Sequence, residues 1–400
     1  MPKRLASIDV FRALTMFFMI FVNDLWTLTN IPDWLDHADA DVDGLGFADI
    51  IFPAFLFIVG LSLPFAIKNR QKAGDSRQAL FFHVFLRSIS LIIIGFFQVN
   101  MEEYSVRALL PRPFYMILLT ISFFMIWLDY PKDMDKNRKV GFQVCGMVLL
   151  LVLAFLYKGG DSVHIIGLRP YWWGILGLIG WSYLISAGCF ILFKGNIWAM
   201  ALVFISFLSF SLLDHMELLH IPERIHRLFW AIGEGAEPAL ITAGIIFSLI
   251  YFDLAKKNLE WRMILILLVA AIVVTLGGLW IRPIGGGISK SDDTPSWVCI
   301  SLAVSFIAYA ILIYLVDIKQ KKDWFQILLP AGTSTLTCYL MPYIYYSLYT
   351  LALRNPWKIP VRLPLVLRTG IPGLMKSMVF SLFIILLVGL MEKRRLRLKL

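Results

Sequence analysis

The chain has 400 residues, of which 59% are hydrophobic and only 16% charged, and its mean hydropathy is +0.76. These values exclude an ordinary soluble globular protein, in which about 25% of residues are charged. The formal net charge of +10 comes from Lys and Arg in short connectors between apolar runs, which indicates membrane topology rather than binding to nucleic acid. The composition therefore predicts an all-α, polytopic transmembrane helix bundle.

The apolar runs predict about twelve spans, because each is long enough to cross a hydrocarbon core of about 30 Å as a helix. In chain order they are 8–28, 47–67, 80–98, 109–128, 141–157, 171–193, 196–213, 235–252, 262–281, 297–316, 326–351 and 373–391. The first lacks a small-residue cleavage site and is a membrane helix rather than a removed signal peptide. Spans 171–193 and 196–213 must form a tight hairpin. We interpret residues 1–400 as one integral-membrane domain with a helical hairpin inserted at 171–213.

The charges of the connectors predict the orientation of the chain. Lys and Arg are concentrated at both ends of the chain and in the alternate connectors 68–77, 132–139, 256–257 and 319–322. By the positive-inside rule, these connectors and both termini are cytoplasmic. The loop around His37 holds five aspartates and no Lys or Arg, so it should face the outside. The basic connector 353–372 would also fall outside, which leaves ten or eleven spans as the alternative count.

Polar residues stand at both ends of the first span and at the outer start of the second, and ionisable groups inside a span are costly and need a partner or a function. Asp9 and Arg12 are three residues apart and can pair across one helical turn. Arg12 and Asn23 are eleven residues apart, so both face one side of the first helix, roughly 16 Å apart along it. His37 follows in the outer loop, and Asp49 opens the second span. Asn23, His37 and Asp49 therefore lie at one membrane depth and can converge.

This combination of side chains predicts acid–base chemistry. A histidine oriented by a carboxylate, with an amide nearby, can remove a proton from an amine or hydroxyl nucleophile and stabilise an oxyanion. The alternative is that His37 is a solvated loop residue. Trp26 and Trp34 either stack on a sugar or belong to the aromatic belt of the membrane interface. Arg87 and Arg112 either form an anion pocket between helices or extend to the membrane surface.

The chain carries no pattern of metal ligands. Its four cysteines lie singly inside apolar runs, and no histidine has a metal-ligand spacing within a helix. We therefore expect neither a disulfide framework nor a metal site.

Two runs near the N-terminus resemble the start of the heparan-alpha-glucosaminide N-acetyltransferase family and its bacterial relatives. They are RLASIDVFRALTMFFMIFVND and FADIIFPAFLFIVGLSLPFAI, with the loop histidine between them. The family pattern is an SxDxFRG-like helix that ends in VN, a loop His, and then ADxxFPxFxFIxG. The matching residues are Ser7, Asp9, Phe11, Arg12, Val22, Asn23, Ala48, Asp49, Phe52, Pro53, Phe55, Phe57, Ile58 and Gly60. Later in the chain, TPSWVCISLAVSF and LLPAGTSTLTCYLM look like the family's late helices.

The resemblance implies an acetyl-CoA-dependent N-acetyltransferase, a membrane-bound acyltransferase. Such an enzyme moves an acetyl group from cytoplasmic acetyl-CoA to the amine, or to a hydroxyl, of a glucosamine-type sugar on the outer side of the membrane. It also implies that Asn23 and His37 are catalytic, and we expect Asp49 to orient His37. Direct transfer and an acetyl-histidine intermediate both remain open.

The remaining predicted site residues would bind the two substrates. The CoA nucleotide is expected at the cytoplasmic mouth of the bundle, where the candidate partners are Arg12, Arg87 and Arg112, with Asp9. The amino sugar or oligosaccharide acceptor is expected at the outer loop, where the candidate partners are Trp26, Trp34 and Asp36. Acetyl-CoA is the cosubstrate in this interpretation, and no metal takes part.

Two other functions remain open at the level of sequence. A transporter or flippase for a sugar or small anion could use the same polar path without covalent chemistry. A structural or partner-binding membrane protein would leave the convergence of Asn23, His37 and Asp49 unexplained. For the enzyme we expect a bacterial inner (cytoplasmic) membrane protein that contacts lipids and has its active-site loop at the periplasmic face. We expect no nucleic-acid partner, and a homodimer is the alternative to a monomer.

Overall fold

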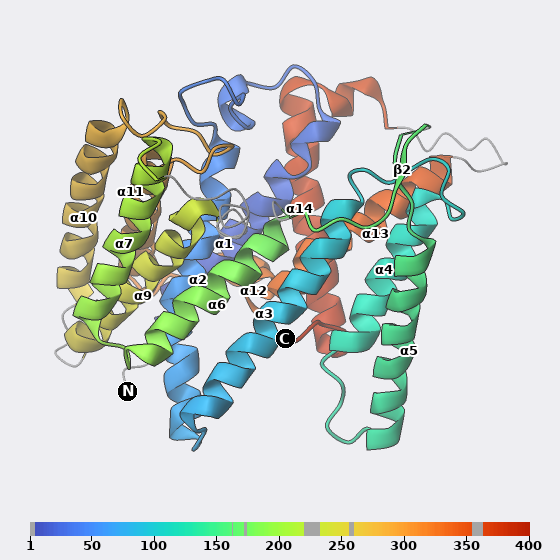
Figure 1. Ribbon diagram of the computed structural model, residues 1–400, viewed down its shortest axis with the longest axis horizontal. Helices are drawn as coiled ribbons and strands as arrows, with labels where there is room; N and C mark the ends of the chain where they lie inside the picture. The colour runs from blue at the N-terminus through green and yellow to red at the C-terminus, as the bar shows by residue number, and fades with distance from the viewer. Residues whose placement is uncertain (1–4, 162, 172–173, 220–232, 256–259, 354–362) are drawn as a thin grey trace.

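The computed structural model describes residues 5–161, 163–171, 174–219, 233–255, 260–353 and 363–400, and it is built mainly from α-helices (Figure 1). The helices are α1 (Ala6–Val22), α2 (Phe47–Lys72), α3 (Arg77–Asn100), α4 (Arg112–Trp127), α5 (Lys136–Leu156), α6 (Ile175–Leu192), α7 (Ile197–His215), α9 (Ala236–Ala255), α10 (Glu260–Ile281), α11 (Pro295–Leu312), α12 (Leu329–Thr333), α13 (Thr335–Leu353) and α14 (Gly370–Lys393). Two short strands, β1 (Gly159–Gly160) and β2 (Ile165–Ile166), pair antiparallel. The predicted all-α class is confirmed.

Each predicted span coincides with a helix, except that the run 326–351 is divided between α12 and α13. Among the described residues, ten helices are long and apolar enough to cross a membrane. Helix α4 is apolar but has only 16 residues, and α13, which contains Pro342, is not among the ten. These helices support an integral membrane protein, whereas the number of spans and the side of the termini stay predictions. Residues 354–362 of the basic connector 353–372 lie outside the described residues.

The connectors alternate between the two ends of the bundle. Figure 1 shows the α1–α2 loop and the α10–α11 loop at one end, and the α2–α3 and α4–α5 connectors at the opposite end. The loop around His37 is thus separated by the length of the helices from the basic connectors 68–77 and 132–139. This is the arrangement that the connector charges predict, although the end that faces the cytoplasm stays a prediction.

Local sequence explains where several helices begin. Ser76, Asp135 and Thr294 precede α3, α5 and α11, and each side-chain oxygen accepts a hydrogen bond from the backbone N–H three residues later. Such caps satisfy an N–H group that has no partner inside the helix. The Thr294 cap also fixes the start of α11, which lies beneath the candidate site.

Glycines let the central helices approach closely. A Cβ at Gly60 of α2 would lie 1.9 Å from the backbone oxygen of Ile241 in α9, and a Cβ at Gly244 would lie 2.1 Å from a backbone oxygen of α2. Helices α3 and α6 meet in the same way, because a Cβ at Gly95 would lie 2.3 Å from the backbone nitrogen of Gly177. Close backbone contact between small residues is the usual basis of helix association in a membrane.

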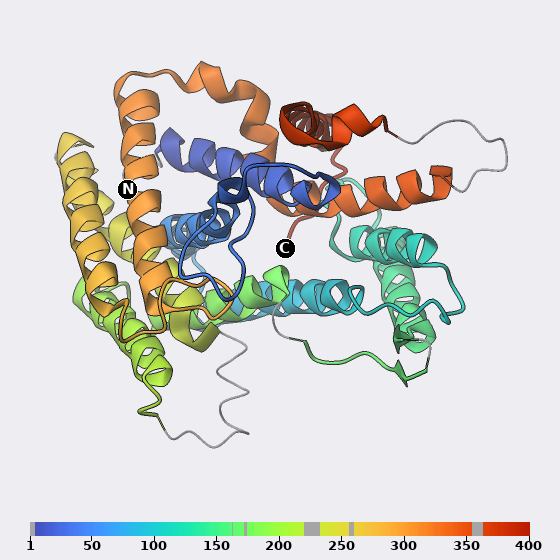
Figure 2. The same cartoon turned by 90° about the horizontal axis from the view of Figure 1, so that it is seen from above.

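Of the tight hairpin predicted for α6 and α7, the turn is present but the close packing of the two helices is not. Lys194 and Gly195 form the turn with φ angles of 54° and 68°. Beyond the turn the two helices diverge, since α6 packs along α3 whereas α7 packs along α9. Helix α6 is part of the wall around the centre of the bundle, opposite α1 and α13 (Figure 2). Whether the hairpin is an insertion stays a prediction.

Candidate active site

A buried carboxylate holds His37. Asp49 lies in the first turn of α2 with its side chain 3% exposed, whereas the side chain of His37 is 46% exposed. Oδ1 of Asp49 lies 2.5 Å from Nδ1 of His37, and Oδ2 accepts hydrogen bonds from the backbone N–H groups of Ala38 (2.9 Å) and Gly46 (3.0 Å). Because the carboxylate accepts the bond from His37, Nδ1 carries the imidazole proton and Nε2 is the basic nitrogen.

The chain around this pair is fixed by local sequence and by α11. A Cβ at Gly46 would lie 1.7 Å from the backbone oxygen of Asp36. Any residue larger than glycine at position 46 would therefore clash with the backbone of the same loop at Asp36. The side chain of Asp36 accepts a hydrogen bond of 2.8 Å from the backbone N–H of His37. Nε1 of Trp297, which is fully buried, donates to the backbone oxygen of Asp49 at 3.1 Å. The histidine and its carboxylate therefore rest on a packed support.

Lys290, which the sequence interpretation missed, also contacts the pair. Its Nζ lies 3.1 Å from Nδ1 of His37 and 3.8 Å from Oδ1 of Asp49. Burial lowers the pKa of Lys290, and the charges of Asp49 and Asp293 oppose that shift. Lys290 belongs to a connector whose length and glycines are visible in the sequence, but it is 253 positions from His37, so no local pattern could reveal the contact.

The α1–α2 loop and the α10–α11 loop are joined by a latch, which we define as Asp43, Arg282 and Ile288. Nε of Arg282 lies 2.9 and 3.1 Å from the two carboxylate oxygens of Asp43, and the backbone N–H of Ile288 donates to Asp43 at 2.7 Å. These contacts, led by the bond from Ile288, lower the pKa of Asp43. The latch holds the loop that carries Lys290 against the loop that carries His37.

Asn23 lies elsewhere, in the wall of a central cavity of about 880 Å³. Trp26 and Arg112 also line this cavity, and the ring of Trp26 meets Tyr346 edge-on with centroids 5.6 Å apart. Of the three catalytic candidates, His37 and Asp49 are in direct contact, whereas Asn23 lines the larger cavity, whose described lining includes neither of them. Equal depth in the membrane does not place groups on the same side of the bundle.

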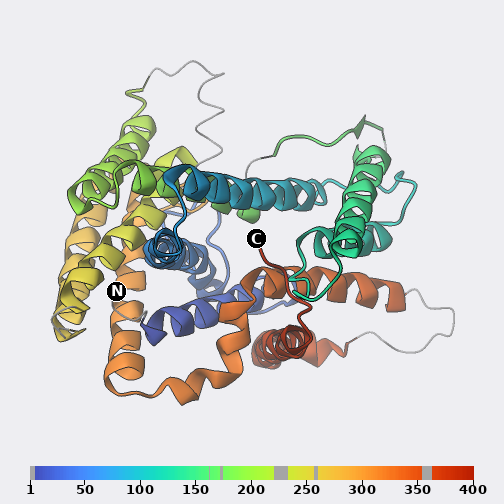
Figure 3. The same cartoon turned by 90° about the horizontal axis from the view of Figure 1, so that it is seen from below.

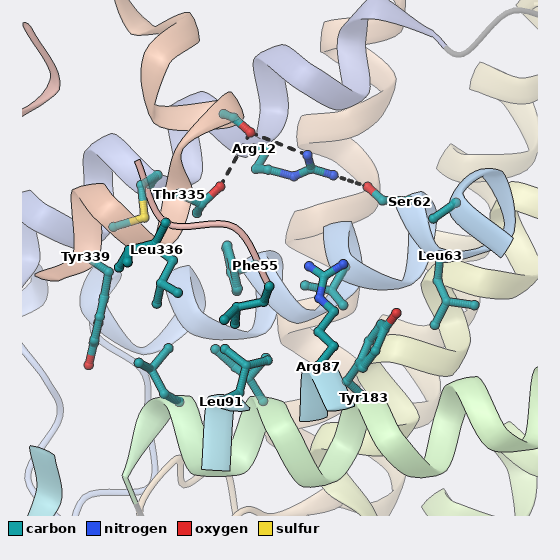
Figure 4. Close-up of a pocket in the computed structure, with 18 of the residues that line it drawn as sticks. Arg12, Phe55, Ser62, Leu63, Arg87, Leu91, Tyr183, Thr335, Leu336 and Tyr339 are labelled. Carbon is teal, nitrogen blue, oxygen red and sulfur yellow. Dashed lines mark hydrogen bonds between the residues drawn. The ribbon is translucent and has the colours of Figure 1, made fainter. Parts of the chain in front are cut away.

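A second cavity, of about 370 Å³, contains Arg12 and Arg87. They enter it from opposite walls, α1 and α3 (Figure 4). Arg12 donates to the side chain of Ser62 and, at 3.4 Å, to the backbone oxygen of Gly332. The described lining includes Lys399 as a third cation and no carboxylate side chain. The cavity is thus electropositive and suits an anionic ligand such as a phosphate group.

The predicted cluster of three arginines requires a correction. Arg12 and Arg87 share the smaller cavity, whereas Arg112 lines the larger one with Asn23. The reason is that Arg112 begins α4, at the opposite end of the bundle from the α4–α5 connector (Figure 1). Asp9 stands in the first turn of α1, before Arg12.

The two cavities adjoin in the middle of the bundle. Both are lined by Met16, Ile175, Leu176 and Tyr339, and these residues come from α1, α6 and α13. Figure 3 shows the C-terminal segment ending between the helices, and its residues Leu398, Lys399 and Leu400 line the smaller cavity. The two cavities thus lie one after the other beside α1, the smaller one at Arg12 and the larger one at Asn23.

A buried ion pair fixes the end of α1 next to Asn23. Asp24 is 2% exposed, and its carboxylate accepts hydrogen bonds from Tyr346 (2.5 Å), Ser377 (2.5 Å) and Lys376 (2.6 Å). The sequence interpretation missed this group too, because Lys376 lies 352 positions away on α14. Its signal is an ionisable residue inside an apolar run, which needs a partner.

The predicted acceptor residues have different surroundings. Trp26 is 73% and Trp34 66% exposed, and only Trp26 lines one of the two cavities described above. Asp36 bonds to the backbone of His37, and Asp43 is part of the latch. Two of the five loop aspartates thus have structural partners. No group of three His, Cys, Asp or Glu side chains in the described part of the chain could hold a metal ion.

Comparisons with known proteins match part of the chain. Residues 4–167 match a family model described as "Domain of unknown function (DUF5009)". The chain is 35% identical over 104 residues to heparan-alpha-glucosaminide N-acetyltransferase of Homo sapiens, and 34% identical over 102 residues to that of Mus musculus. These matches cover 25% and 24% of the chain and 14% of each relative. The chain therefore matches only a small part of the length of these curated relatives.

Proposed function

Since the chain is a distant relative of the heparan-alpha-glucosaminide N-acetyltransferase family, we propose that it is a membrane acyltransferase. It moves an acetyl group from acetyl-CoA to the amine, or a hydroxyl, of an amino sugar on the other side of the membrane. The observation that carries the proposal is the pair of adjoining cavities, of which one is lined by Arg12 and Arg87 and the other by Asn23. A long ligand with an anionic head and a reactive far end fits two cavities placed in this way.

In this proposal the smaller cavity binds the nucleotide part of acetyl-CoA. Arg12 and Arg87 bind its phosphate groups, since guanidinium groups form paired hydrogen bonds with phosphate oxygens. The pantetheine arm lies past Met16 and Tyr339, where the two cavities meet. From Arg12 to Asn23 the path follows three turns of α1, roughly 16 Å. The amide of Asn23 then donates to the thioester carbonyl, whose oxygen gains negative charge during transfer.

His37 is the base in the same proposal. Its Nδ1–H is held by Asp49, so Nε2 accepts the proton from the acceptor amine as the nitrogen bonds to the acetyl carbon. The carbon–sulfur bond breaks, and the thiolate of CoA takes up a proton. Neither described cavity lining includes His37. The proposal therefore requires the acceptor amine to lie between the two groups, at Nε2 of His37 and within reach of the acetyl carbon whose carbonyl Asn23 holds.

The test uses purified protein in lipid vesicles, radiolabelled acetyl-CoA and a panel of amino sugars. His37→Ala should lower kcat at least about 100-fold, the usual contribution of a general base, with acetyl-CoA binding unchanged. His164→Ala is the matched control, because His164 is also a loop histidine beside an aspartate, at 3.7 Å from Asp161, but is 84% exposed. Absence of CoA release with every acceptor, or full activity of His37→Ala, would overturn the proposal.

A transporter or flippase is the second candidate, favoured by the fact that the adjoining cavities cross much of the bundle. It predicts movement of an amino sugar or small anion across vesicles without consumption of acetyl-CoA. Measurement of uptake and of CoA release in the same vesicles distinguishes the two functions.

Within the acyltransferase proposal, an acetyl group found on His37 in the absence of acceptor would identify the route through an acetyl-histidine intermediate.

A further inference from the structure

Lys290 completes a group of three ionisable side chains. Its ammonium group lies 3.1 Å from Nδ1 of His37 and 3.8 Å from Oδ1 of Asp49, and its side chain is 31% exposed. The loop that carries Lys290 is held in place by the latch, whose Arg282 contacts both carboxylate oxygens of Asp43. The position of Lys290 is therefore determined by the fold.

The charges of the three groups decide whether His37 can act as a base. A buried carboxylate whose partner is a histidine favours the imidazolium form, which has no lone pair to accept a proton. With the ammonium group of Lys290 beside it, Asp49 already has a cationic partner. Protonation of His37 would then place two cations next to one carboxylate, which is electrostatically unfavourable.

The other charged groups near the site do not replace Asp49 as the partner of Lys290. Asp36 accepts a bond from the backbone of His37, and Asp293 acts on Lys290. Asp292, Glu234 and Glu237 act on Asp293. Burial and the nearby Glu237 raise the pKa of Asp293 well above its usual value, although Lys290 opposes this shift. Asp49 is the larger of the two charge contributions that favour the ammonium form of Lys290.

We propose that Lys290 is a positioning residue that serves as the counter-ion of Asp49 and thereby keeps His37 neutral, with Nε2 free to accept a proton. Its catalytic consequence rests on the acyltransferase function proposed above. The charge state of His37, however, can be tested whether or not the protein is an acyltransferase. Lys290→Met removes the ammonium group, and Lys290→Arg keeps the positive charge.

The first measurement is chemical. Diethylpyrocarbonate modifies neutral imidazole, and mass spectrometry of the His37 peptide gives the rate of modification. Near neutral pH, Lys290→Met should lower the modification rate of His37 about tenfold, whereas Lys290→Arg should leave it within about twofold of wild type. His164 in the same samples is the internal control, and Lys158→Met, at an exposed outer-loop lysine, is the control variant.

The second measurement is kinetic. Lys290→Met should lower kcat about tenfold near pH 6.5 and recover activity at higher pH, with KM for acetyl-CoA unchanged, while Lys290→Arg stays active. A merely structural lysine would instead lower the melting temperature and leave the pH profile unmoved. The inference is overturned if His37 reacts equally fast in Lys290→Met and wild type. If wild type transfers no acetyl group, the acyltransferase function fails while the labelling result still decides the role of Lys290.

Discussion

The ion pair between Asp24 and Lys376, next to Asn23, gives a testable prediction of how much a buried charge pair stabilises the fold. Asp24 is 3% exposed at its side chain and its partner Lys376 is 16% exposed, with Nζ and Oδ2 separated by 2.6 Å. The variant Lys376→Met removes the cation but keeps an unbranched apolar chain of similar length. It leaves a carboxylate buried at the end of α1 with hydrogen bonds only from the neutral groups of Tyr346 and Ser377.

The expected cost follows from this geometry. Removal of one partner from a buried ion pair costs about 3 to 5 kcal/mol of unfolding free energy, mainly because the remaining charge is left uncompensated. Tyr346 and Ser377 continue to donate, so we expect the lower end, about 3 kcal/mol. Adding Asp24→Asn removes the unpaired charge. The amide oxygen still accepts from one of the two hydroxyl groups, which contact different carboxylate oxygens, and the amide NH2 donates to the other hydroxyl. The double variant should therefore regain at least about 2 kcal/mol relative to Lys376→Met.

The assay is unfolding in mixed micelles with increasing denaturing detergent, followed by tryptophan fluorescence. Arg70→Met is the matched control, because Arg70 and Asp75 form an ion pair at 2.8 Å with side chains 43% and 31% exposed. An exposed pair of that kind should contribute less than about 1 kcal/mol. Equal losses for Lys376→Met and Arg70→Met, or no recovery in the double variant, would refute the reasoning.

Two further predictions concern the helix core and the latch. Gly60→Leu should reduce the folded yield in size-exclusion chromatography and cost more than about 3 kcal/mol, because its Cβ would lie 1.9 Å from a backbone oxygen of α9. Gly141→Leu should keep the yield of the wild type, because a Cβ at Gly141 would meet no atom of another part of the chain within 4 Å. Equal yields of the two variants would contradict the close packing. Hydrogen bonds from Ile288 and Arg282 lower the pKa of Asp43. The latch should therefore stabilise the contact between the two loops fully above the usual carboxyl pKa of about 3.9. This stabilisation should be lost as the pH falls through the lowered pKa of Asp43 in the folded protein. Hydrogen exchange of the α10–α11 loop should stay slow at about pH 5, and Asp43→Ala should make it fast at every pH; slow exchange in that variant would exclude the latch.

Several elements follow from the sequence because they depend on neighbouring residues. Apolar runs must form helices in hydrocarbon, where backbone groups can only be satisfied within the segment. Thr294 and Ser76 mark helix starts by capping the next turn. The contact of His37 with Asp49 was also predictable, since 12 positions separate them and a short loop limits how far they can part.

The site is only partly predictable, because the sequence gives the depth of a residue in the membrane but not the side of the bundle on which its helix lies. The sequence assigns Asn23, His37 and Asp49 to one depth in the membrane, and the helical phase of α1 places Arg12 and Asn23 on one face. It does not assign the side of the bundle that each helix occupies. Arg112 was therefore expected near Arg12, whereas it lines the cavity that contains Asn23.

The sequence by itself determined the apolar helices, the polar loop between the first two, and the family resemblance that they carry. Tertiary structure alone decided that Lys290 reaches His37 and that Lys376 neutralises Asp24, across 253 and 352 positions. The physical reason is that a helix in hydrocarbon satisfies its backbone hydrogen bonds within its own segment, whereas these ion pairs depend on which helices pack together. That choice is made by close backbone contacts such as those of Gly60 and Gly244, which depend on the fit of surfaces distant in the chain.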